Sequence, residues 1–314
     1  MEIVILDAKT LGDDLVLDMF DEFGNVTIYG STAPEEVENR IRNADVVILN
    51  KIKLNGSNLG SAANLKLVCI TATGFDNVDT DYCRKNGIAV CNVKGYSTHS
   101  VAQVTMALAL SLCTHVGEYT DYVSSGKYTE SGVHNYLKPT FHEISGMTWG
   151  VVGLGGIGKQ VARIAAAMGC RVLAFKRTPD SEFECTDIDT LCKNSDIISV
   201  HLPLTAETRE IIGKTQLGKM KDGTLLINMA RGAVVDERAV ADAVKSGKLG
   251  GVGIDVYSVE PMAADHPYTE IMHMDNVLLT PHMAWGAYEA RVRCMTEIAE
   301  NIRAFLRGEE RNRV

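Results

Sequence analysis

The sequence has no long apolar run, no basic surplus and no C-x-x-C cysteine pair, and each absence excludes a class of protein. No apolar stretch reaches the ~20 residues of a membrane-spanning helix, so we expect no membrane partner. The net charge of −9 repels polyanions, so we expect no nucleic-acid partner. The first residues, MEIVILDA, form a strand pattern and not a basic segment before an apolar core, so we expect no secretion signal.

The eight cysteines are scattered, and several lie inside apolar runs such as 67–70 and 107–113, where cysteine is usually a small core residue. Without a secretion signal, scattered thiols favour the reducing cytoplasm. Redox regulation at an exposed cysteine is an alternative, but no resolving pair is evident to support it. The histidines lack metal-ligand spacing, so we expect no metal site.

Short apolar runs alternate with helical patterns along most of the chain, which predicts parallel βαβ units in doubly wound sheets. Two series of runs predict two sheets and therefore two domains, as the length of 314 residues allows. The first series of expected strands covers 3–7, 26–29, 46–49, 67–70 and 89–92. The second covers 148–153, 171–175, 197–201, 224–228, 251–255 and 277–280.

Two long helical patterns link these series. Residues 97–113 form an apolar helix pattern between the series, and 288–307 form another after the last strand. We predict an α/β protein of two Rossmann-like domains with a cleft between them. A substrate-binding domain, discontinuous in sequence, spans 1–97 plus 286–314, and a dinucleotide-binding domain spans 98–285. The polar, tyrosine-bearing segment 115–143 is interpreted as an arm or extended loop at a subunit contact, so a homodimer is expected.

A glycine-rich loop follows the first strand of the second series and opens a helix. Gly153 permits a tight turn, Gly155 lets the backbone approach a pyrophosphate, and Gly158 lets the helix pack on the strand. The helix that begins near Gly156 and Ile157 directs its N–H groups at that anion. A glycine turn without a ligand is the alternative, but the strand-loop-helix-strand context favours a dinucleotide site.

The next strand of a dinucleotide-binding domain usually ends in an acid that binds the adenosine ribose. This chain has Lys176, Arg177 and Thr178 there. Because a guanidinium can bind a 2′-phosphate and an acid would repel it, we expect NAD(P)H with a lean to NADP. The alternative is that both cations face solvent and NAD binds through other contacts.

Three segments follow successive expected strands, so their functional side chains share one edge of a sheet. Arg231 offers a planar cation for a carboxylate, His282 can move a proton, and Glu260 can hold the imidazole. Hydride transfer to a 2-keto acid needs such groups. Each residue also has an ordinary alternative role. Arg231 could be a helix-capping cation, Glu260 a solvated loop acid and His282 a strand-end histidine. Together, downstream of a dinucleotide fingerprint, they predict an oxidoreductase.

Several motifs between about residue 71 and the C-terminus resemble those of the D-isomer-specific 2-hydroxyacid dehydrogenases, whereas the first 65 residues match only in strand-helix rhythm. The matching segments are Thr73-Gly-Phe-Asp-Asn-Val-Asp79, Ser100-Val-Ala-Gln103, Val152-Gly-Leu-Gly-Gly-Ile-Gly158, His201-Leu-Pro-Leu-Thr205, Asn228-Met-Ala-Arg-Gly232, Asp255-Val-Tyr-Ser-Val-Glu-Pro261 and Thr280-Pro-His282.

The resemblance implies roles for these residues. Arg231 would bind substrate, Glu260 would partner the histidine, and His282 would be the acid/base. The backbone at Thr73 and Gly74 would receive the substrate carboxylate. The implied cofactor contacts are Asp255 at the nicotinamide carboxamide and, lining the cleft, Pro203, Met229 and Ala230.

The segments around Tyr96 and Trp285 resemble the glycerate dehydrogenases, also called hydroxypyruvate reductases. The expected substrate is therefore hydroxypyruvate or glyoxylate, with a bulkier 2-keto acid as the alternative. Lys176 and Gln103 depart from the usual acids at their positions, and the first departure puts the family's NAD preference in question. A nucleotide-sensing corepressor on the same fold is a further alternative, which the presence of all three candidate catalytic residues argues against.

Overall fold

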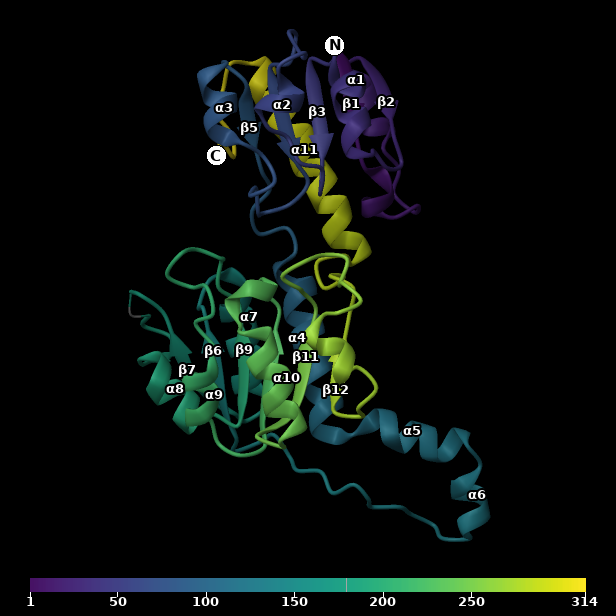
Figure 1. Ribbon diagram of the computed structural model, residues 1–314, viewed down its shortest axis with the longest axis vertical. Coiled ribbons are helices and arrows are strands. Elements are labelled where there is room, and N and C mark those ends of the chain that lie inside the picture. Colours follow the sequence, from purple (N-terminus) through teal and green to yellow (C-terminus); the bar gives the residue numbers. More distant parts are fainter. Residues whose placement is uncertain (179) are drawn as a thin grey trace. The chain divides into compact units, whose positions relative to one another are not determined.

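The computed structural model describes residues 1–178 and 180–314 and divides into two compact units. Unit 1 comprises Met1–Ser97 and Gly286–Val314, and unit 2 comprises Thr98–Trp285. Each unit is built on its own parallel sheet covered by helices (Figure 1). The α/β fold class predicted from the alternating pattern is confirmed, and unit 1 is discontinuous in sequence.

The five strands of unit 1 are all parallel and lie in the order β2-β1-β3-β4-β5. Every residue of β3 and β4 is buried, as expected for central strands with both faces covered. The strands are β1 (Glu2–Ile5), β2 (Asn25–Ile28), β3 (Val46–Leu49), β4 (Leu67–Ile70) and β5 (Ala89–Cys91). The α-helices are α1 (Val37–Ile41), α2 (Gly56–Leu59), α3 (Thr80–Lys85) and α11 (Tyr288–Leu306).

The C-terminal helix α11 belongs to unit 1 and packs against β4. Its buried side chains include Cys294, Met295 and Ile298, which follow the spacing of one helical face. Arg291 donates to both carboxylate oxygens of Asp14, near the start of the chain. The last helix therefore packs on the sheet of unit 1 and is tied by an ion pair to the residues near the start of the chain.

Unit 2 has a seven-stranded parallel sheet in the order β12-β11-β10-β9-β6-β7-β8. This is the dinucleotide-binding order extended by one strand, with its reversal between β6 and β9, where ligands of open α/β sheets bind. The strands are β6 (Thr148–Val152), β7 (Arg171–Phe175), β8 (Glu184–Cys185), β9 (Ile197–Val200), β10 (Thr224–Asn228), β11 (Leu249–Ile254) and β12 (Val277–Leu279). The α-helices are α4 (Thr98–Thr114), α5 (Val116–Ser124), α6 (Lys127–Ser131), α7 (Gly156–Ala167), α8 (Ile188–Asn194), α9 (Lys214–Lys219) and α10 (Glu237–Lys245).

Helix α4 is the long buried helix that the sequence predicts between the two series of strands. It packs on α7, β10 and β11. Glycines in β11 permit this close approach, because a Cβ at Gly253 would lie 3.0 Å from the Cβ of Leu108. A Cβ at Gly251 would likewise lie 3.1 Å from a methyl group of Leu112. The helix thus forms part of the core beneath the sheet.

The arm expected at 115–143 contains two short helices, α5 and α6, which the sequence did not indicate. Figure 1 shows them extending away from the sheet of unit 2, followed by a long stretch of irregular chain. No residue of either helix is buried, and their lengths of nine and five residues are shorter than the window of about 11–18 residues in which a helical apolar period is recognised. Aromatic rings join α5 to the returning chain, with Tyr122 and Tyr136 stacked at 4.0 Å between centroids.

One strand was missed. β8 has only two residues, which pair with β7 at the sheet edge, and neither is apolar enough to form a run. The other expected strands are present, with ends that agree or differ by at most two residues. Strand ends are set by hydrogen-bond geometry more than by residue type.

Candidate functional site

The glycine loop between β6 and α7 is shaped by close backbone contacts. Gly153 has φ +101°, and a Cβ there would lie 2.9 Å from the carbonyl carbon of His201. A Cβ at Gly158 would lie 2.1 Å from the carbonyl oxygen of Gly153. In contrast, a Cβ at Gly155 would meet nothing within 4 Å. The loop is tight on the protein side and open in front of Gly155, at the N-terminus of α7.

Helix α7 starts at Gly156, which Ile157 follows. Its N-cap is Gly155, which has no side chain to bond the free N–H groups of the first turn. The first-turn N–H groups of a helix have no intrahelical partner and carry partial positive charge. A loop that leaves open space in front of these groups fits a dinucleotide pyrophosphate.

His201 follows β9, the strand beside β6 at the reversal of strand order. Both ring nitrogens are buried, and neither has a hydrogen-bond partner among the described residues. Burial lowers the pKa of His201 to about 3, so the ring is neutral. A buried imidazole with two unsatisfied nitrogens next to the glycine loop also fits a site that receives a polar ligand.

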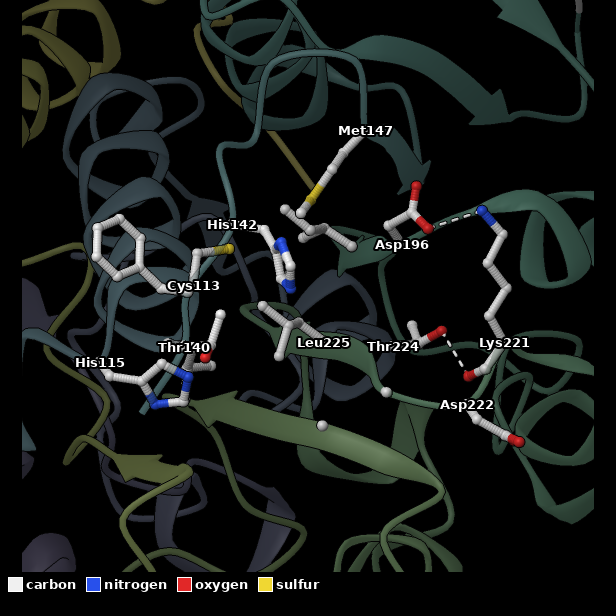
Figure 2. Close-up of a pocket in the computed structure, with 15 residues that line it drawn as sticks. Cys113, His115, Thr140, His142, Met147, Asp196, Lys221, Asp222, Thr224 and Leu225 are labelled. Carbon is white, nitrogen blue, oxygen red and sulfur yellow. Dashed lines mark hydrogen bonds and ion pairs between the residues drawn. The ribbon is translucent and has the colours of Figure 1, made fainter. Parts of the chain in front are cut away.

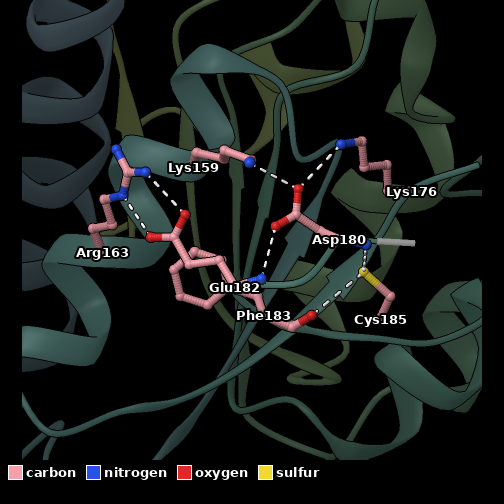
Figure 3. A network of polar contacts seen from close by, with 7 residues as sticks. All are labelled: Lys159, Arg163, Lys176, Asp180, Glu182, Phe183 and Cys185. Carbon is pink, nitrogen blue, oxygen red and sulfur yellow. Dashed lines mark hydrogen bonds and ion pairs between the residues drawn. The ribbon is translucent and has the colours of Figure 1, made fainter. Parts of the chain in front are cut away.

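The cations expected after β7 do not all lie in solvent. Arg177 and Thr178 are exposed, but Lys176 Nζ lies 3.2 Å from Oδ2 of Asp180. The same oxygen lies 2.8 Å from Nζ of Lys159, in the first turns of α7 (Figure 3). Sequence reasoning missed Asp180 because it considered only the residues at the end of the strand.

The three candidate catalytic residues follow β10, β11 and β12, which are neighbours in the sheet. Nδ1 of His282 lies 2.7 Å from Oε2 of Glu260, and both side chains are mostly covered, with 21% and 29% exposed. His282 has φ +53°, a left-handed conformation that is uncommon for a residue with a side chain. Arg231 donates from Nη1 to the carbonyl of Ala230 at 2.8 Å. Pro203, Met229 and Ala230 lie at the carboxyl ends of β9 and β10, the same edge of the sheet.

The segment that carries His282 is held by Asp255, which is buried at the end of β11. Its carboxylate accepts hydrogen bonds from the hydroxyl of Thr280 at 2.6 Å and from the N–H groups of Met283 and Ala284 at 2.8 and 2.9 Å. A carboxylate has about four lone-pair sites, so three bonds leave one for a ligand N–H. Asp255 therefore supports the histidine segment, a role that the sequence did not predict, and keeps one acceptor site for a further donor.

The turn that carries Glu260 is held from two sides. Glu260 Oε1 accepts from the N–H of Tyr257 at 3.2 Å. Glu237 accepts from the N–H of Ser258 at 2.9 Å, and its second oxygen lies 3.0 Å from Nε2 of His266. A Cβ at Gly232 would lie 2.0 Å from the nitrogen of Ser258, so the backbone beside Arg231 touches the same turn.

His266 and Glu237 were not among the predicted site residues. In the structure His266 is buried, with 6% of the residue exposed. Its Nδ1 accepts from the N–H of Tyr268, so both ring nitrogens are engaged. The sequence could not have revealed the contact between His266 and Glu237. The two residues are 29 positions apart, and no local motif links them.

Thr73 and Gly74, the predicted receptors of a substrate carboxylate, lie in unit 1 after β4. The hydroxyl of Thr73 donates to the carbonyl of Val93 at 2.8 Å, and the side chain of Asn92 donates to the carbonyl of Thr73 at 2.7 Å. These bonds tie the segment after β4 to the segment after β5. Nearby, Asp79 accepts from the N–H of Tyr82 and caps α3.

Comparison with known proteins identifies the family. The D-isomer specific 2-hydroxyacid dehydrogenase NAD binding domain matches residues 106–284. The chain is 35% identical to a hydroxypyruvate reductase of Blautia hydrogenotrophica, with 98% of each chain covered. It is 34% identical to a glycerate dehydrogenase of Methylorubrum extorquens, over 99% of this chain and 98% of that one. Among solved structures, an acyclic imino acid reductase in complex with NADPH and D-Arg matches with a TM-score of 0.88 and 29% identity over 100% of both chains.

The chain belongs to the D-isomer-specific 2-hydroxyacid dehydrogenases. The resemblance inferred from the motifs is confirmed, and the relatives cover the first 65 residues as well. The chain is therefore an oxidoreductase that transfers a hydride between a nicotinamide cofactor and a 2-hydroxy or 2-keto acid.

A separate hollow of about 260 Å³ lies at the base of the arm (Figure 2). Its wall includes Phe141 and His142 of the arm and Asp196 and Lys221, which form an ion pair at 2.7 Å. It borders the amino ends of β9 and β10, the opposite edge of the sheet from the candidate catalytic residues. No predicted site residue lines it.

The remaining predictions concern cysteines, metals and membranes. All eight cysteines are free thiols, and only Cys185 is more than slightly exposed. In the described part of the chain, no cluster of three His, Cys, Asp or Glu side chains has metal-binding geometry. Among the same residues, no single helix has the length and apolar character to cross a membrane; only α4 and α5 taken together, bent by 64°, have both.

Proposed function

We propose that this dehydrogenase reduces a small 2-keto acid, hydroxypyruvate or glyoxylate, with NAD(P)H and oxidises the corresponding 2-hydroxy acid in reverse. The observation that carries the proposal is the 2.7 Å contact between His282 and Glu260 at the sheet edge that also bears Arg231. The names of the relatives support the substrate class: hydroxypyruvate reductase and glycerate dehydrogenase.

We assign the proton to His282. Glu260 holds Nδ1, so Nε2 is the nitrogen that donates a proton to the carbonyl oxygen as it becomes an alkoxide. In the reverse direction, Nε2 accepts the hydroxyl proton. The bound cofactor supplies or receives the hydride at the carbon that bears this oxygen.

Arg231 binds the substrate. Its guanidinium is always charged and presents donors in a planar fork, which suits a carboxylate together with the neighbouring carbonyl oxygen. The bond from Nη1 to Ala230 uses one of its five donors and sets the orientation of the side chain. Thr73 and Gly74 in unit 1 are proposed to receive the substrate carboxylate through their backbone, on the resemblance of their segment.

For the cofactor, the glycine loop formed by Gly153, Gly155 and Gly158 would hold the pyrophosphate, with the α7 residues Gly156 and Ile157. The last acceptor site of Asp255 would take the carboxamide N–H, and Pro203, Met229 and Ala230 would line the cleft. The preference for NADP is proposed from Lys176, Arg177 and Thr178. The NADPH complex of the structurally similar imino acid reductase is in keeping with it.

Substrate size rests on two aromatic residues. Tyr96 in unit 1 is buried, and Trp285 in unit 2 is partly buried. Their segments resemble those of glycerate dehydrogenases, which favours a three-carbon or two-carbon acid over a bulkier one.

The test is a set of 2-keto acids, each assayed with NADH and NADPH. We expect the highest kcat/KM with hydroxypyruvate or glyoxylate, and loss of turnover in Arg231→Ala and His282→Ala. Absence of keto-acid-dependent oxidation of either cofactor by the wild-type chain would reject the proposed function. Higher kcat/KM for a branched or aromatic keto acid would reject only the substrate.

We also propose that the chain forms a homodimer through its arm. Along α5, α6 and the chain that follows, the exposed apolar side chains are Val116, Val123, Tyr128, Val133, Tyr136, Leu137 and Phe141. A concentration of exposed apolar surface on a projecting segment favours contact with a second copy. Light scattering should give a dimer mass for wild type and a monomer mass for Leu137→Lys with Val133→Lys. Val16→Lys, an exposed position in unit 1, is the control.

The reducing cytoplasm is proposed as the compartment, because the eight thiols are unpaired and most are buried. Fractionation of cells that express the chain would test it, and recovery of the chain outside the cytoplasm would reject it.

A further inference from the structure

The segment between β7 and β8 contains a nearly buried acidic residue, Asp180, that contacts two lysines. Asp180 Oδ2 accepts from Nζ of Lys159 at 2.8 Å and from Nζ of Lys176 at 3.2 Å (Figure 3). Its Oδ1 accepts from the N–H of Glu182 at 3.0 Å, and its own N–H donates to Sγ of Cys185 at 3.3 Å. Only 7% of the Asp180 side chain is exposed. Its carboxylate is fixed by three contacts, and its backbone N–H makes a fourth.

The two lysines bound by Asp180 come from the elements that frame the adenosine end of a dinucleotide site. Lys159 lies in α7 just after the glycine loop, and Lys176 lies directly after β7. An adenosine ribose lies between these elements in this fold, and its 2′ substituent meets the residues at the end of the second strand. The lysines also hold the pKa of Asp180 well below its usual range, so the carboxylate is charged at any working pH.

A 2′-phosphate and Asp180 would therefore draw on the same two ammonium groups. The phosphate carries more than one negative charge and would lie beside a fixed carboxylate. A ribose 2′-hydroxyl is neutral and meets no such repulsion. The carboxylate thus opposes NADPH and leaves NADH nearly unaffected.

We propose that Asp180 sets the balance between NADPH and NADH, by holding Lys159 and Lys176 as an internal counter-anion that a 2′-phosphate must share. The inference rests on the proposed use of these cations for the cofactor. On this proposal the enzyme uses both cofactors, and Asp180 limits its preference for NADPH over NADH.

The neighbouring acid Glu182 provides a matched control. It lies on the same segment but pairs with Arg163, through contacts of 2.6 and 2.9 Å from Nε and Nη2. Glu182→Gln changes the net charge by the same amount as Asp180→Asn without releasing either lysine. A difference in NADPH affinity between the two variants therefore reflects the release of Lys159 and Lys176 and not the change in net charge.

The experiment measures dissociation constants of NADPH and NADH by fluorescence titration, without substrate. For Asp180→Asn we expect NADPH to bind about tenfold more tightly, as for removal of one close like charge near a protein surface, and NADH to change less than about twofold. For Glu182→Gln we expect less than about a twofold change with either cofactor. Asp180→Ser, which also lacks the charge, should repeat the gain, and thermal melting checks that each variant is folded.

Two results would overturn the proposal. If Asp180→Asn weakens NADH and leaves NADPH unchanged, Asp180 is an acceptor for the ribose hydroxyls. If Glu182→Gln tightens NADPH as much as Asp180→Asn does, only the overall charge matters. A failure of the proposed cofactor site would give a different result. In that case Lys176→Gln and Arg177→Gln, each introduced into the wild-type chain, would leave the dissociation constant of NADPH unchanged.

Discussion

Glu237 accepts the backbone N–H of Ser258 at 2.9 Å, two residues before Glu260. The same carboxylate also binds the hydroxyl of Ser258 at 2.5 Å and His266 at 3.0 Å. On the opposite side of the turn lies Gly232. Its backbone is so close to the turn that a Cβ on this residue would lie 2.0 Å from the nitrogen of Ser258. The turn that presents Glu260 to His282 is therefore held between α10 and the segment that carries Arg231.

This arrangement predicts that Glu237 positions Glu260. In Glu237→Ala, the turn loses two hydrogen bonds at Ser258 and His266 loses one. We expect kcat to fall by up to about 100-fold, the effect of a misplacement of about 1 Å in a catalytic group. The NADH dissociation constant should stay the same, because the glycine loop is on other strands. Asp242→Ala, at an exposed position on the same helix, is the control. Equal kcat values in the two variants would refute a positioning role.

The contact between His282 and Glu260 predicts a graded loss of activity. His282→Gln removes the proton donor, and we expect kcat to fall by about 10²- to 10⁴-fold. Glu260→Gln keeps a hydrogen-bonding side chain but loses the carboxylate, and a smaller fall is expected. Steady-state assays with saturating cofactor measure both values. His273→Gln, at an exposed histidine, serves as the control; a loss in it comparable to that in His282→Gln would contradict the assignment.

The glycine loop predicts opposite effects for two similar substitutions. In Gly158→Ala, the new Cβ would overlap the carbonyl oxygen of Gly153, so we expect a loss of about 1–3 kcal/mol in unfolding free energy. In Gly155→Ala, the Cβ meets no protein atom within 4 Å, so the melting temperature should not change. The methyl group would instead occupy the proposed pyrophosphate space and weaken NADH binding. Tight NADH binding by Gly155→Ala would argue against that location.

The buried imidazole of His201 predicts a loss of stability in acid. Its pKa in the folded chain is lowered to about 3 from 6.5, so below pH 6.5 the unfolded chain takes up a proton that the folded chain does not. The contribution to stability is complete above pH 6.5 and is lost progressively as the pH falls toward 3. When the pH is lowered from about 7.5 to about 5, the melting temperature of His201→Phe should therefore fall by fewer degrees than that of wild type. Equal losses in His201→Phe and in wild type would contradict this.

Much of the fold follows from local patterns. The strands β3, β4, β7 and β10 lie where the apolar runs predict them, because central strands covered on both faces are mostly apolar. The family was also identified from the sequence, since the motifs around Gly155, Arg231 and His282 have a characteristic order. The arm helices α5 and α6 were not predicted, because helices of nine and five residues are too short for an apolar period to stand out.

The sequence by itself determined the fold class, the reaction class and which residues are candidates for the chemistry, because these depend on residue type, spacing and chain order. Only the tertiary structure decided which groups meet across long separations. Glu237 meets His266, Asp255 holds the segment of His282, and Asp180 binds Lys159. Such contacts depend on how strand ends converge at one edge of a sheet, and no local pattern encodes that convergence. The lysine after β7 shows the difference: its position was evident from the sequence, but its ion pair with Asp180 required the fold.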